Sequence, residues 1–273
     1  MIAILFSPIS VRNDASNAYA TEPSSAIIDI AGAPGVFMVG EELEYNVSYS
    51  IFDLGHVRFT VIDTITKFGR TTYRIKAFVD SYSGVPFVDL HQVFYSEMTT
   101  DPYSFFFNIH NTADPEKIYY TEYAFDYSSN KVGYEIGMKP ERKILKTGEV
   151  SISGYQQDGL SLLYYARAHC KQVRQESVAI FFDEKSYVTR FNFMNKIGSK
   201  EIDAVPYPIE TVEFDGNADF TGIFGLTGYF RGFFSNDAAS IPIVARMKVI
   251  LGSINIELMK WTRPGWIPPK ADS

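Results

Sequence analysis

Apolar and polar residues alternate with a period of two along most of this chain. From Leu43 to Ile51 apolar residues occupy every second position, and residues 57–61 and 73–79 repeat the pattern. A strand points successive side chains to opposite faces, so the alternation predicts strands with one buried face. The turns between them are expected at residues 52–55 and 67–70. Links of about four residues join antiparallel neighbours, so these segments predict an antiparallel meander.

The same alternation predicts three more hairpins, at residues 118–136, 178–193 and 243–258. Their turns are expected at residues 128–130, 183–186 and 252–253. Gly252 stands first in the last turn, as a type II′ turn requires. Proline recurs after residue 263, so regular structure should end there and leave a Pro-rich tail over residues 263–273.

One segment departs from this period and predicts a helix. Residues 158–170 carry apolar side chains at positions 160, 163, 164 and 168, which is helical spacing. Asp158 is expected to cap the free N–H groups of the first turn, and we expect about four turns. Gly222, Gly225, Gly228 and Gly232 would let a neighbouring strand bulge and coil. The predicted fold is therefore all-β with one main helix. It is a strongly curved antiparallel meander sheet, half-barrel or barrel-like, with the helix packed against it or plugging it.

The first residues have the order of a secretory signal. Met1–Ile9 is a short apolar run, polar residues follow, and Ala18-Tyr19-Ala20 is an A-x-A-like cleavage site, although a basic n-region is missing. An uncleaved, frayed N-terminus is the alternative. We expect residues 1–20 to be a truncated signal peptide, 21–35 a flexible leader and 36–262 a single curved β-sheet domain. The mature protein would then be periplasmic or otherwise exported to the bacterial cell envelope.

Several short motifs follow one another along the chain. They are residues 40–45 (GEELEY), 125–127 (FDY), the segment from Asp158 to Arg167, Asn236-Asp237, Ile241-Pro242-Ile243 and Gly252-Ser253. Together they resemble the bacterial domain-of-unknown-function 3108 family of exported proteins, over about residues 36–258. The resemblance implies one strongly curved antiparallel sheet with a helix, broadly analogous to periplasmic lipoprotein carriers, and it supplies no catalytic residue. The residues expected to have structural roles are Asp158, Arg167, Gly225, Gly228, Asp237, Pro242 and Gly252.

Composition and charge exclude several classes of function. The net charge of −7 argues against nucleic-acid binding, which needs a basic surface. The single Cys170 excludes an internal disulfide and a cysteine-based zinc site. No stretch reaches the ~20 apolar residues of a membrane helix. No glycine loop precedes the helix to hold a phosphate, and the four histidines are widely spaced, so we expect neither cofactor nor metal.

Three local patterns suggest chemistry, and each has a simpler interpretation. Gly159-Leu160-Ser161 resembles a nucleophile elbow, but the final glycine is Leu163 and the α/β setting is missing. Residues 215–219 open like a calcium loop but lack its later ligands, so an acidic hairpin turn is the better interpretation. Carboxylate pairs such as Glu41-Glu42 are expected to be solvated charges at strand ends.

Aromatic residues are unusually frequent, with 22 Phe, 18 Tyr and 2 Trp. Adjacent aromatics on a strand point to both of its faces, so some should leave the main core. They would fill a large core, or they would line an apolar cavity or groove. The residues proposed to bind a ligand are Phe105, Phe107, Tyr119, Tyr123, Phe125 and Tyr134.

Three functions remain open at this level. The first is a non-enzymatic envelope protein that binds a lipid, a glycolipid or another apolar small molecule in its curved sheet. The second is a structural or assembly protein whose partner is another envelope protein. The third is a hydrolase built on Ser161 or on a carboxylate–histidine pair, which requires Ser161, His91, His110 and Asp158 to meet in one cleft.

Overall fold

The computed structural model describes residues 35–85, 89–114, 116–220, 227–249 and 252–272. Their strands form one antiparallel sheet of 14 strands in the order β8-β7-β6-β5-β4-β3-β2-β1-β14-β13-β12-β11-β10-β9. Every neighbour is therefore the next strand in sequence, except where β1 pairs with β14. This confirms the predicted curved meander. No strand pairing joins the end strands β8 and β9 within the described part of the chain, so the sheet is not closed.

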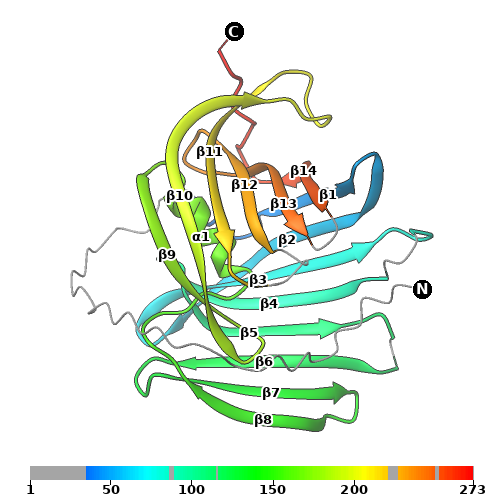
Figure 1. Ribbon diagram of the computed structural model, residues 1–273, viewed down its shortest axis with the longest axis vertical. Helices are drawn as coiled ribbons and strands as arrows, with labels where there is room; N and C mark the ends of the chain where they lie inside the picture. The colour runs from blue at the N-terminus through cyan, green and yellow to red at the C-terminus, as the bar shows by residue number, and fades with distance from the viewer. Residues whose placement is uncertain (1–34, 86–88, 115, 221–226, 250–251, 273) are drawn as a thin grey trace.

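The first half of the sheet contains β1 (Glu42–Tyr49), β2 (Phe52–Lys67), β3 (Arg70–Ser81), β4 (His91–Thr99), β5 (Ser104–Asn111), β6 (Ile118–Asp126), β7 (Lys131–Lys139) and β8 (Lys143–Ser151). Its strands β4–β8 lie in the lower part of Figure 1. The second half curls in front of it and contains β9 (Val173–Phe182), β10 (Lys185–Lys200), β11 (Ile209–Ala218), β12 (Gly228–Ser235), β13 (Pro242–Val249) and β14 (Gly252–Thr262). The helix α1 (Ser161–His169) lies between the two halves.

The core lies on the concave side, where the alternation predicted it. Leu43 and Tyr45 of β1 and Val61 of β2 are each at most 2% exposed. The sheet can curl because glycines replace side chains where large rings lie against the backbone. At Gly232 of β12 an added Cβ would lie 2.3 Å from the ring of Phe214, so the ring takes the place of a side chain. Aromatic packing thus determines where the sheet bends.

Residues 156–158 connect the two halves without being a regular strand. The Gln157 N–H donates to Ala179 O at 2.8 Å, and Phe181 N–H donates to Gln157 O at 2.9 Å, so this segment runs beside β9. On its other side, Ser104 N–H of β5 donates to Gln156 O at 3.0 Å. The chain entering α1 therefore links an edge of the second half to the wall of the first.

The helix differs in length from the sequence prediction. It spans nine residues rather than about four turns. The Asp158 carboxylate nevertheless accepts the N–H groups of Leu160 and Ser161, at 2.6 and 2.8 Å. Asp158 therefore binds free N–H groups as expected, from just before the first turn. The helix is shorter because it begins at Ser161, three residues after Asp158, and its last helical residue is His169.

Three turn predictions were wrong. The first hairpin turns at Ser50-Ile51, because β2 already begins at Phe52. Gly252 pairs with Val249, so Gly252-Ser253 opens β14 rather than forming the turn. Residues 215–218 belong to β11, since their polar side chains occupy one face of a strand whose other face is buried. Turn-forming residue types are in each case used inside a strand.

Some predicted features lie outside the described residues. These are the signal peptide, the leader up to residue 34, Gly222 and Gly225. Gly228 is described and opens β12 with a positive φ of 66°. Pro242 begins β13, and it pairs with Phe234 beside a register shift in the ladder.

Candidate functional site

Four of the six proposed ligand-binding residues lie in the packed core. Phe105, Phe107, Tyr123 and Phe125 are each at most 5% exposed. Phe181 of β9 closes over two of them, with ring centroids 5.2 Å from Tyr123 and 6.0 Å from Phe125. In this region the second half of the sheet fills the concavity of the first half. These four aromatic residues therefore belong to a packed core, which is one of the two alternatives that the sequence left open.

The other two residues lie on the part of the concave face that remains open. Tyr134 of β7 is half-buried and pairs with Tyr123 in register, whereas Tyr119 of β6 is 49% exposed. In Figure 1 strands β9 and β10 cross in front of the left ends of β4–β7, and no described strand lies in front of their right ends. The right ends of β4–β8 therefore present an accessible concave surface.

We call this surface the open wing and define it by its cross-strand rows. Because partners in an antiparallel ladder point to the same face, the register gives its composition. One row joins Ile109, Thr121 and Ile136, and the next joins Asn111, Tyr119 and Met138. Ile109, Thr121, Ile136 and Met138 are half-buried. The open wing is thus a continuous, mostly apolar strip with polar groups on one side.

Lysines border the strip along β8. Lys143 pairs with Met138 and Lys146 pairs with Ile136, so both stand on the concave side. Lys146 forms an ion pair with Glu184 at the β9–β10 turn and lies 5.3 Å from the Tyr134 ring centroid. Among the described residues no carboxylate lies within 4.0 Å of Lys143. An apolar strip next to a free ammonium group can hold an amphipathic molecule with an anionic end.

A second polar cluster is fully buried. Arg167 of α1 and Glu41 before β1 are each 1% exposed, and Arg167 Nη1 donates to Glu41 Oε1 at 2.7 Å. Arg263 also donates to Glu41. Burial acts to lower the pKa of Arg167, but the neighbouring Glu41 carboxylate raises it, and the net shift is upward. Glu41 was predicted to be solvated, and this is wrong because it is buried and forms ion pairs with two buried arginines.

This cluster ties together segments that are distant in sequence. The remaining donors of Arg167 reach backbone carbonyls, which belong to Val36, Ala239 and Ser240. Asp237 holds the same loop, because its carboxylate accepts Ala239 N–H at 2.9 Å and Trp266 Nε1–H at 2.7 Å. All these groups are occupied by internal partners, so the cluster stabilises the fold.

Asp158 is another buried carboxylate, and the groups that hydrogen-bond to it are neutral. Burial raises its pKa, while hydrogen bonds from hydroxyl and backbone groups act in the opposite direction. Ser96 Oγ–H donates to it at 2.5 Å, and Asp158 N–H donates to Ser161 Oγ at 2.7 Å. Ser161 is therefore held inside the helix-capping network.

The described residues do not form the arrangement of Ser161, Asp158 and a histidine that the hydrolase hypothesis requires. His91 is bonded to Asp80 at 2.8 Å, and His110 contacts Lys139 at 3.2 Å. In the described part of the chain no histidine is hydrogen-bonded to Ser161 or Asp158. Nor do three His, Cys, Asp or Glu side chains come together there as a metal ion would require.

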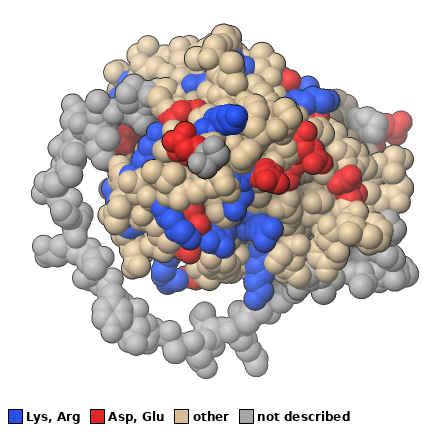
Figure 2. Space-filling view, turned by 90° about the horizontal axis from the view of Figure 1, so that it is seen from above, with Lys and Arg blue, Asp and Glu red and all other residues tan. Residues whose placement is uncertain are grey.

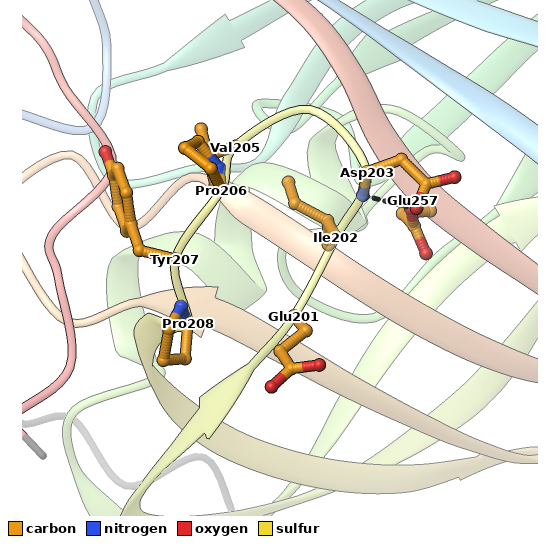
Figure 3. Close-up of a pocket in the computed structure, with 8 residues that line it drawn as sticks. All are labelled: Glu201, Ile202, Asp203, Val205, Pro206, Tyr207, Pro208 and Glu257. Carbon is orange, nitrogen blue, oxygen red and sulfur yellow. Dashed lines mark hydrogen bonds between the residues drawn. The ribbon is translucent and has the colours of Figure 1, made fainter.

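A surface hollow lies elsewhere, at the β10–β11 loop, and has a volume of about 590 Å³ (Figure 3). It is lined by Glu201, Ile202, Asp203, Val205, Pro206, Tyr207, Pro208 and Glu257. Glu257 accepts the Asp203 N–H at 3.2 Å, and the three carboxylates there would repel an anionic group. The open wing lacks such a cluster and is the better ligand surface.

On the face seen in Figure 2, Lys and Arg are interspersed with Asp and Glu.

Comparison with known proteins agrees with this architecture. The model of DUF3108, a family of proteins of unknown function, matches residues 44–259. The chain belongs to this family. A search of curated proteins gave no match. Among solved structures, the DUF3108 chain is similar to a β-barrel-like DUF1849 protein from Brucella abortus, with a TM-score of 0.50 and 14% identity over 82% of this chain and 97% of that one.

The comparison confirms the family expected from the short motifs and the barrel-like fold. At 14% identity the likeness to the DUF1849 protein concerns the fold alone. Both findings are compatible with a non-enzymatic β-fold protein. In the described part of the DUF3108 chain, no helix combines the length and hydropathy needed to cross a bilayer.

Proposed function

We propose that this DUF3108 protein is a non-enzymatic binding protein of the bacterial cell envelope that holds a lipid-like amphipathic molecule on the open wing. The observation that carries the proposal is the continuous apolar strip around Ile136 and Met138, which β9 and β10 leave uncovered. Export is supported by the apolar run and the Ala18-Tyr19-Ala20 pattern near the start of the sequence.

The chemistry of the strip defines the class of ligand. Alkyl chains lose water when they lie along Ile109, Ile136 and Met138, which is favourable by about 25 cal/mol per Å² of apolar surface removed from water. The Tyr119 hydroxyl and the Lys143 ammonium stand beside the strip and would bind a polar end group. Phe181 packs against Tyr123 and Phe125, so we place the bound molecule along the surface beside this contact.

Native mass spectrometry with palmitoyl-lysophosphatidylglycerol as the probe tests the proposal. The full chain should form a one-to-one adduct. Met138→Glu should weaken it at least about ten-fold, because a carboxylate would stand in the apolar strip and next to the anionic headgroup. Lys143→Gln should weaken binding less, by loss of one ion pair.

Ile144 supplies the matched control. It is 53% exposed and pairs with Gly137, so it lies on the convex face of the same wing. Ile144→Glu should leave the adduct unchanged. Equal losses in Met138→Glu and Ile144→Glu, or no adduct with the unchanged chain, would rule out the open wing as the ligand site.

A further inference from the structure

The hairpin between β1 and β2 carries an unusual group of exposed apolar side chains. Ile51 is 86% exposed, Phe52 64% and Tyr49 40%. Hairpin turns ordinarily carry Gly, Asn, Asp or Ser, because these residues tolerate positive φ and hydrogen-bond to water. Here only Ser50 fits that rule, with a φ of 55°. We call residues 49–52 the apolar tip.

The apolar tip continues the concave face. Tyr49 pairs with Phe52, so both side chains project to the same side of the hairpin. Tyr49 follows Val47 by two positions, and Val47 pairs with Ile256 on the concave side. The Tyr49 ring lies over Gly252, where an added Cβ would be only 2.8 Å from it. The tip is therefore ordered by its neighbours, and its apolar side faces the same way as the open wing.

We infer that the apolar tip docks this protein on a lipid surface by inserting Ile51 and Phe52. The inference rests on the proposed function, since a protein that holds a lipid-like molecule must meet the surface that supplies it. The tip is the blue loop that projects at the right of Figure 1, on the side where the concave face is open. A projecting tip fits into a bilayer interface, and Tyr49 is an aromatic residue of the kind found at that level.

Charge indicates which force holds the tip in place. The chain has a net charge of −7, and the exposed Asp53 follows the tip directly. Attraction to anionic headgroups is therefore weak, and the transfer of Ile51 and Phe52 out of water provides the binding. Apolar insertion is insensitive to ionic screening, so the docking should persist at about 1 M salt, where the Debye length is about 3 Å.

Sedimentation with phosphatidylcholine vesicles tests the inference with the full chain. The unchanged protein should bind at low and at high salt. The double variant Ile51→Ser/Phe52→Ser should bind at least about ten-fold more weakly, since two large apolar side chains no longer leave water. Both positions are exposed, so the unfolding midpoint should stay the same, and this is measured on the same preparations.

Phe68 is the matched control, because it is 76% exposed at the tip of the next hairpin, at the far end of the 16-residue strand β2. Phe68→Ser should bind vesicles like the unchanged chain. A second readout uses Phe52→Trp with brominated phosphatidylcholine, which should quench the new tryptophan. No binding by the unchanged chain, equal loss in Phe68→Ser, loss of binding in high salt or absence of quenching each overturns the inference.

The two proposals fail separately. If the apolar tip docks as inferred, the double variant loses vesicle binding but still forms the lysolipid adduct, because the open wing is intact. An adduct without any vesicle binding by the unchanged chain overturns the docking inference and leaves the ligand site standing. Vesicle binding without an adduct overturns the ligand site instead.

Discussion

Replacement of Arg167 by glutamine is the sharpest test of how this fold is held together. The guanidinium is 1% exposed and donates to Glu41 at 2.7 and 3.2 Å. It also donates to three backbone carbonyls, those of Val36, Ala239 and Ser240. Glutamine has two donors on a shorter side chain, so most of these acceptors would be left buried and unpaired.

The magnitude follows from those contacts. A buried acceptor without a partner costs about 1–3 kcal/mol, so three carbonyls already give at least about 3 kcal/mol. Removing one partner of a buried ion pair costs about 3–5 kcal/mol, which agrees with the loss derived from the three carbonyls. Glu41 keeps Arg263, so the loss should not exceed this range. For a chain of this size the melting temperature should fall by about 6–20 °C.

Urea unfolding followed by tryptophan fluorescence measures the effect, because Trp261 and Trp266 flank the third member of the cluster, Arg263. The control is Arg190→Gln, which removes an exposed ion pair with Asp219. The side chain of Arg190 is 59% exposed and that of Asp219 is 42% exposed. That variant should lose less than about 1 kcal/mol. A loss below about 1 kcal/mol in Arg167→Gln, with an unchanged denaturant slope, would refute the assignment of Arg167 as a central tie.

Two further predictions concern Asp158 and the bending of the sheet. Burial raises the pKa of Asp158 in the folded protein above its ordinary value of 3.8. The stability that this group contributes is therefore fully present below pH 3.8 and is lost as the pH rises through the pKa of the folded state. As the pH is raised from acidic to neutral, Asp158→Asn should therefore become more stable relative to the unchanged chain. Urea titrations at several pH values measure the free energy of unfolding of both proteins. Parallel dependences on pH would contradict the prediction. Gly232→Ala should cost about 1–3 kcal/mol, because its Cβ would lie 2.3 Å from the Phe214 ring. A melting temperature equal to that of the unchanged chain would show that the ring moves away freely.

The strands were predictable because the inward face of each is apolar and the links are short. The hairpin predicted at residues 118–136 contains β6 and most of β7, since apolar residues alternate on both sides of a turn of Ser, Ser and Asn. The pairing of consecutive strands followed from the same links, whereas the pairing of β1 with β14 did not. The length of the helix did not follow, because the residues from Asp158 to Leu160 form a capping turn before the helix begins at Ser161.

The open wing could not be separated from the core by sequence alone. Tyr119 and Tyr123 have the same residue type and the same face, yet one is 49% exposed and the other 3%. The difference arises from Phe181, which comes from a strand about 60 residues later and covers only one end of β6. Periodicity reports the face of a strand but not how far a distant element extends along it.

The buried charges, in contrast, left a signal in the sequence. Glu41 has the same parity as Leu43 and Tyr45, so the alternation places it on the inward face. Arg167 follows Leu160 by seven positions and Tyr164 by three, which is the apolar side of the helix. An inward carboxylate and an inward guanidinium require partners, since neither is stable alone in a core. Opposite charges on two inward faces therefore predict a contact between the segment before β1 and the helix, and here Arg167 of α1 makes that contact with Glu41.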